Sequence, residues 1–325
     1  MKASFNRRTF LGAVSSLALA RTGLAQDARW PTKPITIVVP SAAGGAADFT
    51  ARTFGNFITK VIPTATVVVD DKPGAGGIVG TMAVKTAPAD GYTYLISTNS
   101  THAANVSLFS KLDYDPQRDF EPVGVFGTFG TVLMVNASSP HKTLPQLIQF
   151  AKSNPNKLSF GYYSSSSRVP AELLKARAQI NCTAVSYKNI TQIVTDLLGG
   201  FIDFAFMDML SAAPALQNAR LLPLAVSASK REVTLPQVAT VADTLPGFEV
   251  QGWIGLHAPA GSPKPALARV EQLIQQAMAN EDVHKALESR GMSVSYMSAE
   301  AMRTYVKEDV VRWAEWVKLA GIQPQ

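Results

Sequence analysis

Small residues and hydroxyl groups collect in three short segments of the chain, and the first of them is suited to holding an anion. It lies between an expected strand and an expected helix, and its candidate ligand-binding residues are Ser41, Ala42, Ala43, Gly44, Gly45 and Asp48. Small side chains let a ligand approach the backbone, and free N–H groups at a helix start carry partial positive charge. We therefore expect an anion site that needs no cationic side chain. The alternative for the loop is a tight turn without a ligand. Asp48 could bind an amine or water, or its negative charge could only complement the partial positive charge of the helix start.

The other two segments carry hydroxyl groups near strand ends. Thr98, Ser100 and His102 follow the third expected strand, and open α/β sheets bind ligands at such ends. A run of four serines precedes a helix of the second unit and is suited to gripping an anion from the opposite side: Ser164, Ser165, Ser166 and Ser167. The simpler interpretations are a polar loop with one capping serine and a packing or surface role for His102.

The glycine-rich loop Gly74–Gly80 resembles a dinucleotide-binding fingerprint. It departs from G-x-G-x-x-G because Val79 stands in the place of the last glycine. It also follows the second strand, whereas the nucleotide motif opens the first strand–helix turn. We therefore interpret it as a structural turn.

Motifs of common hydrolases and metal enzymes are missing from the sequence. There is no G-x-S-x-G elbow, and the histidines, which form no H-E-x-x-H pattern, are His102, His141, His257 and His284. The single cysteine, Cys182, excludes an intrachain disulfide and a cysteine-rich zinc site. We expect neither a cofactor nor a metal.

The elements that must position these segments alternate between strands and helices. In the first unit, β-branched runs predict strands at 35–39, 66–69 and 92–97, with helices at 46–61 and 78–87. This βαβαβ order implies a mostly parallel sheet flanked by helices. In the second unit the expected strands are 131–135, 158–161, 184–187, 202–206 and 222–227, and the expected helices are 143–152, 170–179 and 190–198.

The last third of the chain is predicted to be mostly helical. Ser262, Asn280 and Ser298 are expected helix caps. The final helix carries a broken apolar stripe that we interpret as core packing rather than a partner surface: Met302, Tyr305, Val306, Trp313, Trp316 and Val317.

The N-terminus has the plan of an export signal. Arg7 and Arg8 precede the apolar stretch Phe10–Ala20, and small residues end at Ala25. The twin arginine followed by Thr-Phe-Leu resembles a Tat signal, although Sec signals also carry paired arginines. We expect residues 1–25 to be removed and the remaining chain to be a soluble protein of the periplasm.

Charge and length fit that interpretation. The chain of 325 residues has 30 Lys+Arg against 24 Asp+Glu, a net charge of +6 that at first suggests nucleic-acid binding. Lys2, Arg7, Arg8 and Arg21 precede the expected cleavage point, so 26 basic residues would face 24 acidic ones, or +2. The basic excess belongs mainly to the signal, and we expect no nucleic-acid partner.

Several motifs occur in order along the chain and together resemble one known family. They are Trp30-Pro31-x-Lys33-Pro34, Pro40 with Gly44-Gly45-x-x-Asp48, Pro73-Gly74-Ala75-Gly76-Gly77, Ala89-Asp90-Gly91-Tyr92, Tyr114-Asp115-Pro116, Tyr187-Lys188, Asp196-Leu197-Leu198-Gly199-Gly200 and Pro246-Gly247-Phe248. The sequence is thus similar to Bug-type periplasmic solute receptors of the tripartite tricarboxylate transporter family. The similarity covers essentially the whole chain after the signal.

The resemblance implies a two-lobed, Venus-flytrap fold of type II that holds a small carboxylate in its cleft. It places lobe 1 in residues 26–130, lobe 2 in 131–250 and a return to lobe 1 in 251–325. It also implies membrane transporter subunits as partners on separate chains, and we expect a monomer that is not an enzyme. Pro40–Asp48 is the family's lobe 1 loop, and Tyr187 and Asp208 match positions that face the cleft.

The lobe 2 loop departs from the family pattern, because it has lost its glycines and Arg168 replaces a histidine. Tyr162 and Tyr163 at the cleft mouth are suited to stacking on a flat ligand, and Arg168 to forking onto a second carboxylate. We therefore expect an aromatic or dicarboxylic acid; the alternative leaves the tyrosines packed on the lobe and Arg168 in water. The alternative functions are an exported hydrolase or isomerase of carboxylic acids and an orphan ligand sensor.

Overall fold

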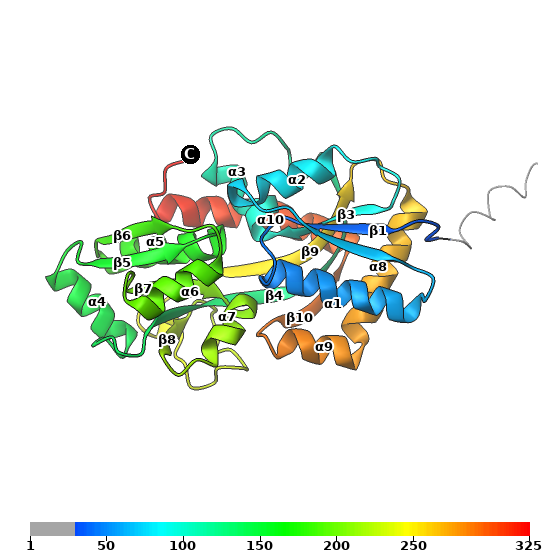
Figure 1. Ribbon diagram of the computed structural model, residues 1–325. Helices are drawn as coiled ribbons and strands as arrows, with labels where there is room; N and C mark the ends of the chain where they lie inside the picture. Colours follow the sequence, from blue (N-terminus) through cyan, green and yellow to red (C-terminus); the bar gives the residue numbers. More distant parts are fainter. Residues whose placement is uncertain (1–29) are drawn as a thin grey trace, which may run out of the picture.

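The computed structural model describes residues 30–325, which form two lobes on one continuous sheet of ten strands (Figure 1). Along the sheet the strands run β2-β1-β3-β9-β4-β7-β5-β6, and β8 and β10 pair with β4 beside this path. We call the part with β1, β2, β3, β9 and β10 lobe 1 and the part with β5 to β8 lobe 2. The predicted α/β class and two lobes are confirmed. The expected signal, residues 1–25, lies outside the described residues.

Lobe 1 opens with three parallel strands whose apolar residues pack on both faces. Ile37 and Val39 lie in the cluster with α1, whereas Val38 packs with α2 on the opposite face. A strand buried on both faces reads as a continuous apolar run, as this one does. The elements are β1 (Ile35–Val39), α1 (Ala46–Val61), β2 (Val67–Asp71), α2 (Ile78–Lys85) and β3 (Thr93–Thr98), followed by a π-helical turn, Ser100–Ala104, and α3 (Asn105–Leu108).

Lobe 2 repeats the parallel arrangement, with β5 between β6 and β7. Its elements are α4 (Leu144–Ser153), β5 (Leu158–Tyr162), α5 (Ser165–Ala178), β6 (Cys182–Ser186), α6 (Ile190–Gly199), β7 (Phe204–Asp208), α7 (Met209–Leu216) and β8 (Leu221–Val226). The sequence misses α7 and starts α5 at Pro170, too late. The serines instead form the first turn of α5, with Ser164 as its N-cap.

Two long antiparallel strands join the lobes and make the sheet mixed rather than mostly parallel. In β4 (Phe120–Asn136) the residues up to Gly130 pair with β9 (Gln251–Pro259), and those from Thr131 pair with β7 and β8. Gly252 is required where it pairs with Phe129 across the two strands, because a Cβ there would lie 2.5 Å from the Phe129 ring. The predicted lobe bounds stay a prediction.

The C-terminal part is α8 (Lys264–Ala279), α9 (Glu281–Glu288), β10 (Ser293–Ser298) and α10 (Ala299–Leu319). Asn280 and Ser298 cap helices as predicted, whereas the Ser262 hydroxyl donates to the Pro259 carbonyl and Pro263 takes the N-cap. The predicted stripe of α10 is core. Met302 packs in lobe 1 with Trp253, and Trp313 packs in the main cluster of lobe 2.

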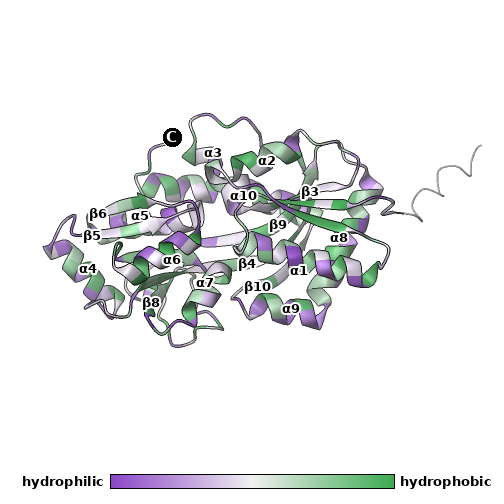
Figure 2. Ribbon diagram, viewed as in Figure 1, coloured by the Kyte–Doolittle hydropathy of each residue, from purple (hydrophilic) through white to green (hydrophobic). Residues whose placement is uncertain are grey.

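The hydropathy of the elements follows this burial. In Figure 2 hydrophilic residues appear on the outer helices α4 and α9, whereas β8 is hydrophobic. No helix among residues 30–325 is long and apolar enough to cross a membrane.

Candidate functional site

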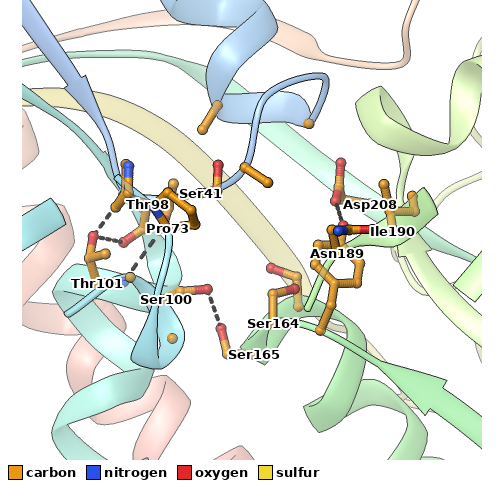
Figure 3. A pocket seen from close by; sticks show the side chains of 18 of the residues that line it. Ser41, Pro73, Thr98, Ser100, Thr101, Ser164, Ser165, Asn189, Ile190 and Asp208 are labelled. Atoms are coloured by element: carbon orange, nitrogen blue, oxygen red, sulfur yellow. Dashed lines mark hydrogen bonds between the residues drawn. The ribbon is translucent and has the colours of Figure 1, made fainter. Parts of the chain in front are cut away.

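A cavity of about 850 Å³ lies between the lobes, and the starts of five helices meet at it (Figure 3). The N-cap residues of α1, α2, α5, α6 and α7 all line it: Gly45, Gly77, Ser164, Asn189 and Asp208. Each helix start presents N–H groups with partial positive charge. The arrangement is therefore suited to binding an anion without a metal.

The helix starts differ in how they are capped. In lobe 2, the Asn189 side chain accepts from the Gln192 N–H and the Asp208 side chain from the Ser211 N–H. In lobe 1, α1 and α2 begin at glycines, which have no capping side chain of their own. The Ala46 N–H of α1 donates to Ser211 Oγ of lobe 2, and the Ile78 and Val79 N–H groups of α2 donate to the Ala75 and Gly74 carbonyls. In α1 this leaves the Ala47 N–H, which lies at the cavity, as a first-turn donor for an anion.

The loop before α1 forms one wall of the cavity, through Ser41, Ala42, Ala43 and Gly45. Asp48 does not reach the cavity: its carboxylate accepts the Gly44 N–H at 2.8 Å and pairs with Arg52 Nε at 2.6 Å. Asp48 is 5% exposed, so its predicted ligand role is corrected to bracing the loop. Gly44, whose φ is +84°, likewise turns the loop without lining the cavity.

The opposite wall meets this loop through direct hydrogen bonds between the lobes. Ser100 Oγ lies 2.6 Å from Ser165 Oγ, and the Asn99 amide donates to Ser165 and Ser166 at 3.2 and 3.1 Å. The Ala46 N–H at the start of α1 donates to Ser211 Oγ at 2.9 Å. The structure thus brings Thr98, Ser100 and the first serines together at the cavity; their role in ligand binding stays a prediction.

Two predicted residues lie behind the wall. His102 is fully buried because the π-helical turn directs Ser100 and Thr101 to the cavity and His102 to the core, where it stacks on His257 at 4.0 Å. Burial lowers the pKa of His102 to about 3, so the ring is neutral near pH 7. Ser167 is also buried, and its hydroxyl accepts the Tyr163 and Ser164 N–H groups. Both are corrected to structural residues.

The glycine loop 73–77 lines the cavity, which the sequence analysis did not predict. Its glycines still have a packing reason. A Cβ on Gly77 would lie 2.8 Å from Thr101 Cγ2, and one on Gly80 would lie 2.8 Å from Pro40 Cα. The loop is therefore both a close-packed turn and a wall of the site.

Sequence reasoning missed several other polar lining residues. They are Asn99, Thr101, Asn105, Ser186, Lys188, Asn189, Thr191 and Ser211. Asn189 and Ser211 carried one available signal, since each lies at a helix start that follows a strand.

Comparison with known proteins bears directly on this geometry. The profile of the tripartite tricarboxylate transporter family receptor (TctC) matches residues 50–322. The chain belongs to this family. A UPF0065 protein from the tcbD–tcbE intergenic region of Pseudomonas sp. strain P51 is 33% identical over 96% of this chain and 93% of its own. Protein BugT of Bordetella pertussis is 28% identical over 96% of this chain and 98% of its own, which supports the Bug-type assignment.

Solved structures of TctC-type proteins share the fold. Rpa4515 of R. palustris with adipate superposes with a TM-score of 0.88 at 29% identity, covering 91% of this chain and 100% of that one. The periplasmic binding protein BugD superposes with a TM-score of 0.85 at 30% identity, covering 91% of this chain and 100% of that one. MatC of Rhodopseudomonas palustris with bound malate gives 0.81 at 28% identity, covering 89% and 100%. The two-lobed periplasmic-binding-protein fold is confirmed.

Within this TctC fold, Tyr163 and Asp208 form a pair in lobe 2. The Tyr163 hydroxyl donates to the Asp208 carboxylate, and burial together with that negative charge holds the pKa of Tyr163 well above its usual range. Asp208 is 6% exposed and lines the cavity. The contact anchors the hydroxyl of Tyr163, whose side chain also lines the cavity, at the end of β7.

Arg168 and Tyr162 form a second pair in the same lobe. The Arg168 guanidinium lies 5.2 Å from the centre of the Tyr162 ring, and both side chains line the cavity. Arg168 Nε is buried with no hydrogen-bond partner among residues 30–325. The structure therefore places a cation with unused donors at the cavity.

Tyr187 also lines the cavity, from the loop before α6. Its hydroxyl donates to Asp196 at 2.7 Å, and its ring packs over Gly161, where a Cβ would be 3.1 Å away. Burial and the Asp196 contact raise the pKa of Tyr187 to about 12, so it stays protonated.

Proposed function

We propose that this protein is an extracytoplasmic receptor that binds one small organic carboxylate in the inter-lobe cavity and presents it to a tripartite tricarboxylate-type membrane transporter. The observation that carries the proposal is the convergence of five helix starts on one cavity, two of which begin at a glycine. Among the lining side chains the charged ones are Arg168, Lys188 and Asp208, so cationic side chains outnumber anionic ones there.

The ligand carboxylate is proposed to sit at the starts of α1 and α2. Backbone N–H groups there are donors of fixed orientation, so they bind an anion without loss of side-chain entropy. Adipate and malate in the related structures are carboxylates of a size that such a cavity admits. The sequence-level choice between an aromatic and a dicarboxylic acid remains part of this proposal.

Binding is proposed to favour the closed arrangement of the lobes. A ligand that touches α1 in lobe 1 and the serines of α5 in lobe 2 gains its full contacts only when the lobes meet. The hydrogen bond between Ser100 and Ser165 and the bond from Ala46 to Ser211 would then add to the closed state. The closed form would be the one that the transporter subunits recognise.

Export to the periplasm through the Tat-like segment, residues 1–25, completes the proposal, together with a monomeric state and no cofactor. An exported hydrolase is less well supported, because the cavity lining within residues 30–325 includes no His, Cys or Glu to act as nucleophile or base.

A thermal-shift screen of carboxylic acids with product analysis tests the function. We expect dicarboxylates to raise the Tm without being consumed. A ligand bound at 100 times its Kd should stabilise the fold by about 2.7 kcal/mol. Turnover of any hit would replace the receptor with an enzyme, and a panel without a single shift would remove the carboxylate proposal.

A further inference from the structure

Arg168 stands out because nothing in the described protein neutralises it. It lies in the first turns of α5 and lines the cavity. No ion pair or side-chain hydrogen bond joins its guanidinium to another residue between 30 and 325, and its Nε is shielded from solvent. A buried donor without a partner is unfavourable, so an unmatched guanidinium at a ligand cavity points to a partner supplied by the ligand.

The position of Arg168 in its helix strengthens this point. The first turn of α5 contains no acidic residue, and Arg168 follows directly after Ser165, Ser166 and Ser167. A cation near a helix N-terminus opposes the helix dipole, which favours anions there. The arrangement raises the positive potential at this side of the cavity. It makes sense for anion binding and not for helix stability.

The neighbouring tyrosines decide between the two ligand classes left open above. The Tyr162 ring is already in cation–π contact with Arg168, and Phe160 lies 6.3 Å from it on the same strand. The Tyr163 hydroxyl is held by Asp208. Both rings therefore support protein side chains. Both rings also line the cavity, but each is already held against a protein group, Tyr162 on the guanidinium and Tyr163 on Asp208, which favours an aliphatic ligand over an aromatic one that needs a free ring face.

We propose that Arg168 is a specificity-determining residue that receives the second carboxylate of an aliphatic dicarboxylate, with Tyr162 fixing the plane of its fork. This inference rests on the proposed function, which places the first carboxylate at α1 and α2. Because those starts lie in lobe 1 and Arg168 lies in lobe 2, a dicarboxylate bridges the lobes. A monocarboxylate reaches only one of the two anion sites, so it stabilises the closed form less.

Calorimetric titration tests the inference with matched ligands. The probes are straight-chain dicarboxylates of four to six carbons, the monocarboxylates of the same lengths, and benzoate. The best dicarboxylate should bind the unchanged protein about 10- to 100-fold more tightly than its monocarboxylate partner, as a charge-assisted bidentate contact allows. Arg168→Gln should remove this difference and leave monocarboxylate affinity unchanged, and Arg168→Lys should restore only part of it.

Two controls separate this role from a structural one. Lys188→Gln removes another lining cation, one that lies on an exposed loop, and should change the ratio between dicarboxylate and monocarboxylate by less than about threefold. The Tm of Arg168→Gln without ligand should equal or exceed that of the unchanged protein, because the variant relieves an unfavourable charge at the start of α5.

The outcomes distinguish the role of Arg168 from the function of the protein as a carboxylate receptor. If Arg168→Gln weakens both ligand classes equally, or if benzoate binds best, the assignment of Arg168 is wrong while the carboxylate receptor stands. If Lys188→Gln rather than Arg168→Gln abolishes the preference, the second site belongs to Lys188. If no carboxylate binds at all, the proposed function and the inference fall together.

Discussion

At the scale of single residues, the cavity wall depends on glycines that permit close backbone approach. Gly77 has a φ of +90° and is the N-cap of α2. A Cβ on it would lie 2.8 Å from the Thr101 side chain and 3.3 Å from the Pro40 side chain. Only glycine combines that backbone conformation with that lack of space. The wall is therefore rigid where the ligand is proposed to sit.

Gly77→Ala should lower the free energy of unfolding by more than backbone strain alone explains. Gly261 provides the matched control, because its φ is +81° and a Cβ there meets nothing within 4 Å. We expect Gly77→Ala to cost about 1–3 kcal/mol more than Gly261→Ala in urea unfolding, from the added clash with Thr101. Equal losses in the two variants would mean that the wall yields easily.

His102 gives the fold a dependence on pH. Its pKa is about 3 in the folded chain because of burial, against about 6.5 when unfolded. Between these values only the unfolded chain binds the proton, so stability falls as the pH drops below 6.5. The variant His102→Gln has no imidazole at this position, so its unfolded chain does not take up this proton. The difference in unfolding free energy between the two proteins should shift in favour of the variant by about 1.4 kcal/mol per pH unit below 6.5. A difference that stays constant from pH 8 to pH 5 would contradict the burial argument.

At the scale of elements, the sequence predicts the parallel strands, β8 and the second part of β4 well, but it misses β9, β10 and the first part of β4. β9 is buried on both faces and contains Gly252 and Gly255, so it shows no alternation of polar and apolar residues. The first part of β4 is broken by glycines in the same way, since a Cβ on Gly127 would lie 2.5 Å from the Ser293 carbonyl. These glycines exist for contacts with distant segments, which a local pattern does not contain.

The candidate site was predictable to a similar degree. The loop before α1 and the serines of α5 were found because helix starts after strands have a local signature. Asn99 and Ser211 were missed because their importance depends on partners in the other lobe, Ser165 and Ala46. The orientation of His102 depends on a π-helical turn that no local motif announces.

The glycine cap of α1 leads to a direct prediction. Gly45→Asp adds a carboxylate at the N-cap, where a Cβ has ordinary contacts of 3.6 Å or more. This carboxylate should occupy the position proposed for the ligand, keep or slightly raise the Tm, and weaken carboxylate binding at least about 10-fold. Gly45→Ala, which adds the Cβ without the charge, should bind within about threefold of the unchanged protein. Equal affinities in the two variants would place the anion elsewhere.

At the scale of the whole molecule, the lobes meet through polar contacts at the cavity and through apolar packing of Ala104 and Leu108 against lobe 2. Asn99 is central to them, because its amide donates to Ser165 and Ser166 while its oxygen accepts the Trp253 N–H from β9. The long strands β4 and β9 connect the lobes beside these contacts. The proposed opening of the lobes would break these hydrogen bonds.

Asn99→Ala should favour the open arrangement of the lobes. We expect a larger radius of gyration by small-angle X-ray scattering at subsaturating ligand and an affinity loss of about 5- to 30-fold, for two hydrogen bonds removed from the closed state. Asn105→Ala, at another lining asparagine whose partners lie within lobe 1, should change the scattering little. Identical scattering curves for Asn99→Ala and the unchanged protein would argue against a closure role for Asn99.

The central claim, that one carboxylate is held between the lobes by helix starts, is tested most directly by a crystal structure with the carboxylate that gives the largest thermal shift. The account predicts one ligand in the inter-lobe cavity, with a carboxylate within hydrogen-bond distance of backbone N–H groups at the starts of α1 and α2. A ligand outside this cavity, or one whose carboxylate contacts neither helix start, would contradict it.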